Sequence, residues 1–539
     1  MREAIKDLLL NYASGFKDRD DLEAGKRIIC RRYGLAAIPN SDILKEYRLL
    51  LTKSKITQIT GLERILRKRP VRTLSGIAPV AVLTKPYPCP GSCAYCPREK
   101  NVPASYLSNE PAVMRAIRCG YDPYKQVVLR LKALENNGHE PTKIELIVIG
   151  GTWSYLPITY KYWYIVNCFR AANDYSKLNR LVFKRPAKEE KFNLGLKSPY
   201  AKGLSLRELS AALIREQKKN EKAIYRFIGL TLETRPDYIN VKEVQEMRVL
   251  GATRVEIGVQ AVDDKILRLN KRGHGVKEIA GATRLLKEYG FKVTYHLMPA
   301  LPGATPPKDL LMFKKLFSDE RFQPDQIKFY PTVVTSGSLL HRWYKQGKYK
   351  PYSDKQLQEL IVKCKAVVPP YVRIIRLIRD IPAESIIAGN KITNLRQIMK
   401  DRGVKCKCIR CREAKERVIA SNYKITTIKY PASGGREYFI SAASQDGRTL
   451  YGFCRLRIDK NSPVAPAIIR ELHVYGELVS IGGKKQVQHS GLGQKLLREA
   501  EKIAVQKKAY PMAIISGVGV REYYRKLGYK LKNSYMVKK

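Results

Sequence analysis

The 539-residue sequence has no stretch that approaches the roughly 18 consecutive apolar residues of a membrane-spanning helix. Its opening, MREAIKDLLL, carries charges where a secretory signal peptide needs an apolar core. It also lacks internal repeats and low-complexity tracts, and a hydrophobic content of 44% with 28% charged residues argues against global disorder. We therefore expect a folded cytoplasmic protein with no membrane partner.

Acidic residues are scarce, since 49 Asp and Glu oppose 101 Lys and Arg and leave a formal net charge of +52 spread along the chain. A salty or hot cytoplasm can favour highly charged surfaces, but such surfaces normally gain acidic residues too. Lys and Arg that replace the counterions condensed on phosphates bind nucleic acids strongly and largely independently of sequence. The imbalance therefore favours a nucleic-acid partner, and we expect RNA.

Disulfide pairing is not indicated, because the eleven cysteines are odd in number and six of them form two tight clusters. This pattern indicates metal ligation in a reducing compartment. The other five are isolated, and we expect them to be small buried hydrophobic residues. They are Cys30, Cys119, Cys168, Cys364 and Cys454.

The length predicts about three domains, at roughly 100 to 200 residues each. We divide the chain into a basic helical leader, a barrel, a cysteine-rich linker and a second α/β domain. These segments span residues 1–70, 71–380, 381–417 and 418–539. The leader shows helical apolar spacing in IKDLLLNYA and ILKEYRLLL, and it ends in the basic run RILRKRPVR.

Short β-rich runs alternate with helix-like stretches in the barrel segment. The runs are VAVLT, KIELIVIGG, FIGLTLE, RVEIGVQ, KVTYHLMP and QIKFYPT. This alternation predicts parallel strands in a complete or partial β/α barrel. The last segment differs, since hairpin-like strands surround the turn Asp446-Gly447 before strands and helices alternate to the end. The predicted fold class is therefore α/β, with a barrel followed by a separate α/β domain.

The first cysteine cluster, Cys89, Cys93 and Cys96, places three thiolates on one loop after the first predicted strand. Three ligands leave one iron of a 4Fe-4S cluster open. An open iron can chelate the amino and carboxylate groups of S-adenosylmethionine (SAM) and pass an electron to its sulfonium. A structural zinc site also uses nearby cysteines, and the spacing alone leaves these two interpretations close to even.

Polar residues at successive strand ends favour the iron–sulfur interpretation, because barrel active sites lie at the carboxyl ends of strands. Tyr95 precedes the last cysteine of the cluster, where radical enzymes of this kind carry an aromatic residue. The region resembles the radical SAM superfamily. We expect SAM to contact four residues at these ends, namely Gly150, Gly151, Glu233 and Gln260.

The C-terminal segment contains a glycine loop, QHSGLG, which opens the helical stretch LGQKLLREAEKIA. It matches the pyrophosphate loop of the GCN5-related (GNAT) acetyltransferases, whose backbone N–H groups at a helix N-terminus hold coenzyme A. The preceding strand, RELHV, could pair with the pantetheine arm. Tyr523 or Tyr524 is expected near the thioester sulfur, and helix packing is the alternative role for either tyrosine.

A radical SAM barrel followed by a GNAT domain resembles the family of Elongator catalytic subunits, in a stand-alone archaeal form. MRAIRCGYDPY, IGGTW, ETRPDY, EIGVQ, RGH, RELHVYG, SGVG and YYRKLGY stand in the family's order. The resemblance implies a tRNA carboxymethyluridine synthase. An adenosyl radical would take hydrogen from the methyl of acetyl-CoA, the acetyl radical would add to carbon 5 of the wobble uridine, and thioester hydrolysis would follow.

A homodimer is left open, no other Elongator subunit is implied, and the leader is expected to bind tRNA.

The same resemblance implies acetyl-CoA contacts. They fall on Lys143, Glu471, Leu472, His473, Val474, Val487, Gln488, His489 and Tyr524. Lys143 and Tyr524 are also the catalytic candidates. Lys143 lies in the barrel segment and would reach the coenzyme across the domain boundary, whereas a solvated surface charge is its alternative.

The second cluster, Cys406, Cys408 and Cys411, lies in the linker amid basic residues. Tight thiolate spacing on a connector predicts a structural zinc site. The family resemblance implies a histidine beside the three cysteines, and His341 is the candidate for this fourth ligand. Reduced cysteines in a flexible basic loop are the alternative.

Two rival functions fit parts of the sequence. A protein lysine acetyltransferase would use the barrel as a support, but a strongly cationic enzyme is a poor match for cationic protein tails. A non-catalytic RNA-binding scaffold would need neither the cysteine triplet nor the glycine loop.

Overall fold

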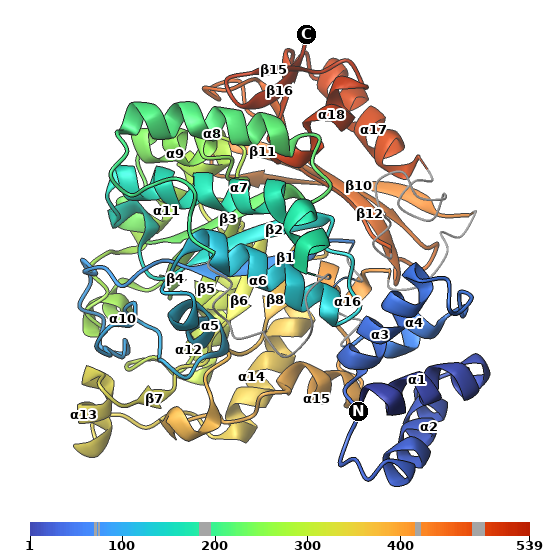
Figure 1. The fold of residues 1–539 in the computed structure, drawn as a ribbon. Helices are drawn as coiled ribbons and strands as arrows, with labels where there is room; N and C mark the ends of the chain where they lie inside the picture. The colour runs from blue at the N-terminus through green and yellow to red at the C-terminus, as the bar shows by residue number, and fades with distance from the viewer. Residues whose placement is uncertain (69–72, 74–75, 183–195, 415–421, 477–490) are drawn as a thin grey trace.

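Three groups of elements follow one another along the chain, as the colour gradient in Figure 1 shows. The computed structural model describes residues 1–68, 73, 76–182, 196–414, 422–476 and 491–539. None of the helices in these residues combines the length and apolar composition needed to cross a bilayer.

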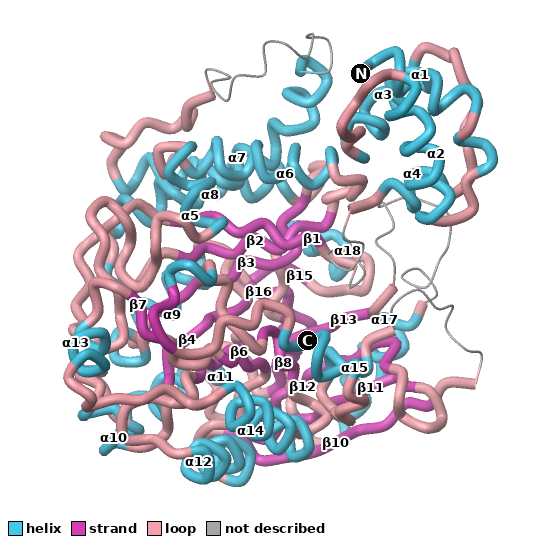
Figure 2. The backbone as a smooth tube through the Cα atoms, turned by 90° about the horizontal axis from the view of Figure 1, so that it is seen from below, coloured by secondary structure: helices cyan, strands magenta, loops and turns pink. Residues whose placement is uncertain are grey.

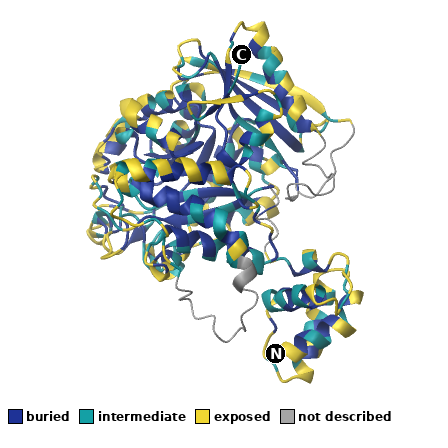
Figure 3. Cartoon of the chain, turned by 45° about the horizontal axis from the view of Figure 1, so that its top comes forward, coloured by how far each residue is buried: buried dark blue, intermediate teal, exposed yellow. Residues whose placement is uncertain are grey.

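The N-terminal lobe consists of four helices: α1 (Arg2–Asn11), α2 (Arg19–Arg32), α3 (Asn40–Thr52) and α4 (Leu62–Leu66). Helix α2 begins where the Asp18 carboxylate accepts hydrogen bonds from the backbone N–H groups of Asp20 and Asp21, at 2.9 and 3.1 Å. The apolar helix faces enclose a core separate from that of the rest of the chain, and the lobe lies beside the main body (Figure 3). The predicted helices at both apolar repeats are confirmed.

The middle of the chain forms a half-barrel of seven parallel strands in the order β1-β2-β3-β4-β5-β6-β8. The strands are β1 (Ala78–Leu83), β2 (Lys143–Ile149), β3 (Arg226–Thr234), β4 (Arg254–Gln260), β5 (Lys292–Leu297), β6 (Gln326–Phe329) and β8 (Arg373–Arg376). All six predicted strands are confirmed. Strand β8 was not predicted, because its sequence RIIR has only two apolar residues between arginines.

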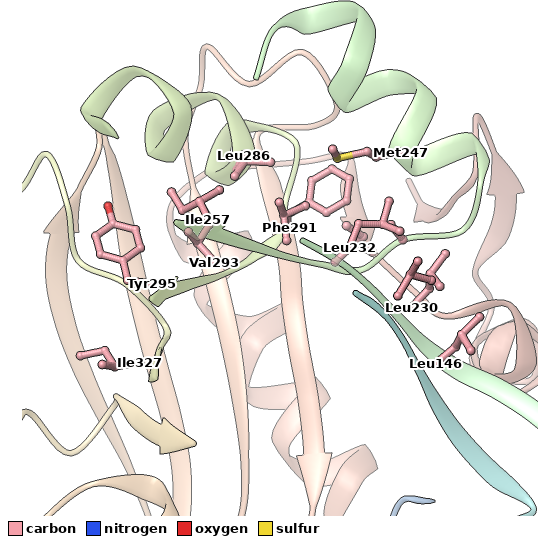
Figure 4. Packing of buried hydrophobic residues seen from close by; sticks show 14 of the residues in the cluster. Leu146, Leu230, Leu232, Met247, Ile257, Leu286, Phe291, Val293, Tyr295 and Ile327 are labelled. Atoms are coloured by element: carbon pink, nitrogen blue, oxygen red, sulfur yellow. The ribbon is translucent and has the colours of Figure 1, made fainter. Parts of the chain in front are cut away.

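Helices cover the outer face of this sheet. They are α6 (Pro123–Asn136), α7 (Ile158–Val182), α8 (Leu206–Asn220), α9 (Val241–Val249), α11 (Val276–Glu288), α12 (Pro306–Ser318) and α14 (Asp354–Val367). Alternate strand residues such as Leu232 and Val293 point outward and pack against Met247 of α9 and Leu286 of α11 (Figure 4). The opposite residues of each strand therefore face the barrel interior.

Shorter elements connect the main ones. They are α5 (Pro111–Arg118), α10 (Asp264–Leu269), α13 (Leu339–Lys345), α15 (Leu395–Asp401), α16 (Ile409–Arg412) and the two-stranded sheet of β7 (Val334–Thr335) and β9 (Ile386–Ala388). The prediction for the isolated cysteines is confirmed for Cys119, Cys168, Cys364 and Cys454, which are buried. It is wrong for Cys30, which is only half-buried on the small N-terminal lobe.

The C-terminal part is a second seven-stranded sheet in the order β10-β11-β12-β13-β14-β16-β15. Its elements are β10 (Lys424–Ala432), β11 (Gly435–Ala443), β12 (Leu450–Ile458), β13 (Ala467–Val474), α17 (Leu492–Gln506), β14 (Met512–Ile514), α18 (Arg521–Arg525), β15 (Lys530–Lys532) and β16 (Tyr535–Lys538). The predicted hairpin at Asp446-Gly447 joins β11 to β12, and the predicted helix is α17.

The second sheet packs beside the half-barrel (Figures 1 and 2), and its contacts fall at the amino ends of the barrel strands. Gly517, before the 3₁₀ helix η8 (Val518–Val520), lies so close to β3 that an added Cβ would be 2.0 Å from the Ile228 carbonyl oxygen. Arg470 of β13 binds Asp325, which directly precedes β6. The two units therefore abut at backbone contact distance.

Candidate active site

A single cavity of about 1980 Å³ runs through the half-barrel and continues into the second unit. Inward-facing residues of the barrel strands line it, together with β13, the start of α17 and α18. One end reaches Tyr95 of the cysteine loop, and the other reaches Gly491 and Tyr524. The carboxyl ends of the barrel strands and the C-terminal sheet thus open onto one space.

The cysteine loop lies at the carboxyl end of β1. Arg272 Nη1 is 3.3 Å from Cys93 Sγ, and Arg235 Nη1 is 3.9 Å from the same sulfur. A hydrogen bond from Cys96, helped by the two guanidinium groups, lowers the pKa of the Cys93 thiol to about 4 although burial opposes this shift. The same hydrogen bond raises the pKa of Cys96 well above its ordinary value, so the loop stabilises a thiolate, the form that ligates metal, at Cys93.

Sulfur spacing separates the two cysteine clusters. Among the described residues, the sulfurs of Cys406, Cys408 and Cys411 all lie within 4.8 Å of one another, whereas those of the first cluster do not. A tetrahedral zinc with Zn–S bonds of about 2.3 Å brings its sulfur ligands to about 3.8 Å from one another. In the first cluster Cys93 and Cys96 are hydrogen-bonded to each other, so its more open spacing comes from Cys89.

Two residues beside the first cluster have unused polar atoms. The Tyr95 hydroxyl and Gln260 Oε1 are buried, and neither has a hydrogen-bond partner within the described ranges. Gln260 also adopts a left-handed backbone conformation with φ of 69° at the end of β4, a conformation that costs energy in a non-glycine residue. Unsatisfied polar atoms and local strain on a cavity wall are typical of a ligand site.

Gly150 closes the next strand end with φ of 128°, and a Cβ there would lie 2.3 Å from Thr84 Oγ1. The glycine pair Gly150-Gly151 therefore lets the backbone turn close to β1. Glu233 lines the cavity nearby and accepts a hydrogen bond from the Tyr106 hydroxyl at 3.1 Å. Of the four expected SAM contacts, Glu233 and Gln260 line the cavity, whereas Gly150 and Gly151 are not among its lining residues.

A chain of ionisable groups occupies the middle of the cavity. His296 Nε2 is 2.8 Å from Glu256 Oε2, and its Nδ1 is 3.6 Å from Glu233 Oε1. Burial would raise the pKa of Glu256, but Lys328, His296 and Arg254 hold it well below its ordinary value. The barrel interior therefore keeps a buried carboxylate charged between its two ends.

Cationic residues ring the amino ends of the strands, where the barrel meets the second sheet. They are Lys143, Arg226, Arg254, Lys292 and Arg373. Burial lowers the pKa of the Lys143 amine to about 8. Lys143 is therefore a cavity residue at the domain boundary and not the solvated surface charge that was its alternative.

The strand expected to contact acetyl-CoA lies on the other side of this ring, because Glu471, Leu472, His473 and Val474 all line the cavity. Glu471 Oε2 accepts a hydrogen bond from Arg455 Nε at 3.0 Å, so its side chain is held by its own sheet. The remaining predicted contacts, Val487, Gln488 and His489, lie outside the described residues.

The two tyrosines of α18 differ. Tyr524 is buried, whereas Tyr523 is partly exposed and its hydroxyl lies 3.2 Å from the position of a Cβ added to Gly493. Burial raises the pKa of Tyr524 far above its ordinary value, which keeps its hydroxyl protonated. Both line the cavity, so Tyr523 joins the candidates on the coenzyme side.

The second cysteine cluster lies where α16 packs on β8. Lys365 Nζ is 3.6 Å from Cys411 Sγ, and Ile409 donates a backbone hydrogen bond to the Val372 carbonyl at 2.9 Å. Three sulfurs at this spacing fit a structural zinc ion. His341 on α13 is not brought together with them in the part of the chain that the structure describes.

Sequence reasoning missed the side chains that surround the predicted ones. Arg235 and Arg272 stand in the quoted motifs ETRPDY and RGH, but nothing local links them to a cysteine 142 or 179 residues earlier. Lys292 and Arg373 are single cations, each the first residue of its strand. A signal for them would have been that several other barrel strands also begin with a cation.

Family models match both parts of the chain. The radical SAM superfamily matches residues 200–314, the radical SAM C-terminal domain residues 324–403 and the acetyltransferase (GNAT) family residues 410–529. The predicted fold class is thereby confirmed.

Similar proteins span most or nearly all of the chain. A tRNA uridine(34) acetyltransferase of Dehalococcoides mccartyi is 46% identical, covering 87% of this chain and 99% of the relative. Human Elongator complex protein 3 is 36% identical, covering 99% of this chain and 96% of the relative. The structure of the archaeal Methanocaldococcus infernus Elp3 with an N-terminal deletion aligns with a TM-score of 0.69 at 37% identity, over 86% of this chain and 99% of that chain. The chain therefore belongs to the Elongator complex protein 3 family, in which a radical SAM half-barrel precedes a GNAT domain.

Proposed function

We propose that this chain is a tRNA carboxymethyluridine synthase, which uses SAM and acetyl-CoA to modify carbon 5 of the wobble uridine. The observation that carries the proposal is the single cavity joining the cysteine loop to the acetyltransferase sheet. Two separate cavities would suit two separate reactions. One shared cavity suits an acetyl group activated at one end and held from the other.

The cluster held by Cys89, Cys93 and Cys96 would supply the electron that cleaves SAM. Gly150, Gly151, Glu233 and Gln260 would contact SAM, and the unused Gln260 oxygen would gain a partner there. The guanidinium groups of Arg235 and Arg272 would keep Cys93 in its thiolate form. These two side chains also give the pocket around the sulfurs a positive charge.

On the coenzyme side, β13 would pair with the pantetheine arm, and Lys143 would place a cation at the boundary between the units. Val487, Gln488 and His489 complete the proposed acetyl-CoA site. Tyr524, protonated and buried, would donate a proton to the departing thiolate of coenzyme A. The acetyl end would then point along the barrel interior.

Basic side chains at the cavity rim support tRNA as the substrate. Arg19 of the N-terminal lobe and Lys391 are exposed and line the cavity. Phosphate binding by such residues positions a nucleic acid without reading its sequence. The leader of residues 1–70, the barrel of residues 71–380 and the terminal domain would then act on one bound tRNA.

Zinc held by Cys406, Cys408 and Cys411 is part of the proposal, as a structural ion that fixes the linker of residues 381–417 between the two sheets. The close spacing of the three sulfurs supports this role. The fourth ligand is not assigned, and His341 is the candidate from the sequence. Stoichiometric zinc alongside iron in the purified protein is expected by metal analysis.

The proposal is tested by anaerobic reconstitution with iron and sulfide, followed by incubation with SAM, acetyl-CoA and tRNA. Nucleoside mass spectrometry should detect carboxymethyluridine with the wild type and none with Cys93→Ala. The rival lysine acetyltransferase predicts no carboxymethyluridine from either protein and equal acetylation of protein lysines by both. Absence of carboxymethyluridine, with equal protein-lysine acetylation by both proteins, would overturn the proposal.

A further inference from the structure

Strand β13 contains a bulge at Arg470. Its neighbours pair with β12 as Ile469 with Leu456 and Glu471 with Arg455, so Arg470 has no partner in the ladder. A bulge leaves one residue unpaired and re-aims its side chain. Here it separates the buried first half of β13 from the second half, which lines the cavity.

The Arg470 side chain crosses the boundary between the two units. Its Nη1 donates to Asp325 Oδ2 at 2.9 Å and to the Phe291 carbonyl at 2.6 Å, and its Nη2 donates to Asp325 Oδ1 at 2.5 Å. Its Nε donates to Glu437 Oε2 at 3.1 Å within its own sheet. Asp325 and Arg470 have fully buried side chains.

Asp325 is itself fixed in the barrel. Its Oδ2 accepts the backbone N–H of Val293 at 2.9 Å, and its own N–H donates to the Val293 carbonyl at 3.0 Å. Its carbonyl accepts the N–H of Arg373 at 3.0 Å. These hydrogen bonds fix the Asp325 carboxylate between β5 and β8. The carboxylate in turn fixes the position of the Arg470 guanidinium group.

Buried ion pairs of this kind add little net stability compared with apolar residues of similar size, because each charge must lose its hydration. Their directional hydrogen bonds fix geometry instead. Lys287, Arg455 and Glu437 extend the same buried network, with Lys287 Nζ 3.6 Å from Glu437 Oε1 and Arg455 Nη1 3.5 Å from Asp325 Oδ1. The network thus ties the bulge of β13 to the start of β6 from several sides.

We propose that Asp325 is a positioning residue for acetyl-CoA: through Arg470 it sets the position of Glu471–Val474 relative to the barrel passage. The inference rests on the proposed function, because it assumes that these residues bind the coenzyme. Asp325 does not line the cavity. Under this inference it nevertheless determines the affinity for the coenzyme.

The test measures binding of a non-hydrolysable thioether analogue of acetyl-CoA by calorimetry, using the anaerobically reconstituted full chain. Asp325→Asn keeps the side-chain volume and removes the charge. Binding should weaken about tenfold, the effect typical of losing a charged hydrogen bond. Cleavage of SAM in the absence of acetyl-CoA should keep its wild-type rate, because that chemistry lies at the opposite end of the cavity.

Two control variants separate positioning from general loss of stability. Glu243→Gln makes the same chemical change at a buried carboxylate that pairs with Lys161 at 2.8 Å, away from the second sheet. Tyr535→Phe removes a hydrogen bond between the units, from the Tyr535 hydroxyl to the Tyr289 carbonyl at 2.8 Å, without touching β13. Both should bind the analogue as the wild type does.

Arg470→Lys provides a second variant, because lysine keeps the charge and loses the fork that binds both Asp325 oxygens. It should weaken analogue binding as Asp325→Asn does, and it carries the test if Asp325→Asn fails to fold. Wild-type affinity in a folded variant, or equal weakening in the two controls, would overturn the inference and leave the proposed function intact. A wild-type protein that does not bind the analogue would overturn the proposed function itself.

Discussion

At the scale of single residues, the ionisable side chains that face the cavity differ with depth along the barrel. Cations stand at the amino ends of the strands, a charged carboxylate at Glu256 stands in the middle, and thiolate-stabilising arginines stand at the carboxyl ends. The cations suit the anionic coenzyme proposed at the amino ends, and the arginines suit the cysteine thiolates at the carboxyl ends. Lys143 is the barrel side chain that gives the simplest test of this match.

The affinity for acetyl-CoA should fall as the pH rises through the pKa of Lys143, which burial lowers from 10.5 to about 8. Lys143 is charged below pH 8 and loses its charge above it, so an interaction with the anionic coenzyme weakens at higher pH. At pH 9 the charged fraction is about tenfold smaller than at low pH, so binding that depends on it should weaken about tenfold. Calorimetric titrations between pH 7 and 9 provide the measurement.

Lys143→Arg should remove this pH dependence, since arginine stays charged throughout the range. Lys530→Arg, at an exposed position on β15, serves as the matched control and should keep the wild-type profile. A pH-independent wild type, or the same loss in Lys143→Arg, would show that the Lys143 charge does not contribute. The free energy of unfolding depends on pH in the opposite direction. Burial favours the neutral Lys143 amine, so the free energy of unfolding should rise as the pH increases from about 8 to 10.5.

At the scale of elements, local sequence was sufficient for the barrel strands other than β8 and for the gathering of Cys406, Cys408 and Cys411. Six barrel strands were predictable because apolar runs such as KIELIVIGG alternate with helical stretches. The contact between Asp325 and Arg470 was not predictable, because the two residues are 145 positions apart and each reads locally as an ordinary surface charge. Likewise His341 was a candidate only through the family resemblance, because the position of α13 depends on tertiary packing that the sequence does not show.

The docking of η8 on β3 gives a prediction at this scale. Gly517→Ala places a Cβ 2.0 Å from the Ile228 carbonyl oxygen, a contact that only a backbone shift can relieve. The free energy of unfolding should fall by about 1–3 kcal/mol, as for other overpacked sites. Gly203→Ala is the matched control, because no atom lies within 4 Å of its added Cβ. Equal denaturation midpoints for the two variants would mean that the close approach is not needed.

At the scale of the whole molecule, the net charge of +52 predicts binding to tRNA that weakens steeply with salt. Arg19 places the N-terminal lobe at the cavity rim. Removing residues 1–70 should therefore weaken tRNA binding and reduce the slope of log affinity against log salt by about one for each phosphate that the shortened chain no longer binds. Filter binding at several salt concentrations measures both quantities, and an unchanged slope would place the tRNA site elsewhere.

The arrangement of the two sheets was the part of the molecule that sequence left open. Charge and motifs predicted a radical domain and an acetyltransferase domain. They did not predict at which end of the barrel the acetyltransferase domain would dock. The structure joins them through the barrel interior, with the cysteine loop at the carboxyl ends of the strands and β13 at the amino ends. This arrangement implies that the acetyl methyl group reaches SAM inside the barrel.

Transfer of deuterium tests that implication most directly. The reconstituted protein is incubated anaerobically with tRNA, SAM and acetyl-CoA deuterated on its methyl group, and the 5′-deoxyadenosine released is analysed by mass spectrometry. The account predicts that deuterated 5′-deoxyadenosine accumulates in proportion to carboxymethyluridine. Carboxymethyluridine formed while the 5′-deoxyadenosine stays unlabelled would contradict it.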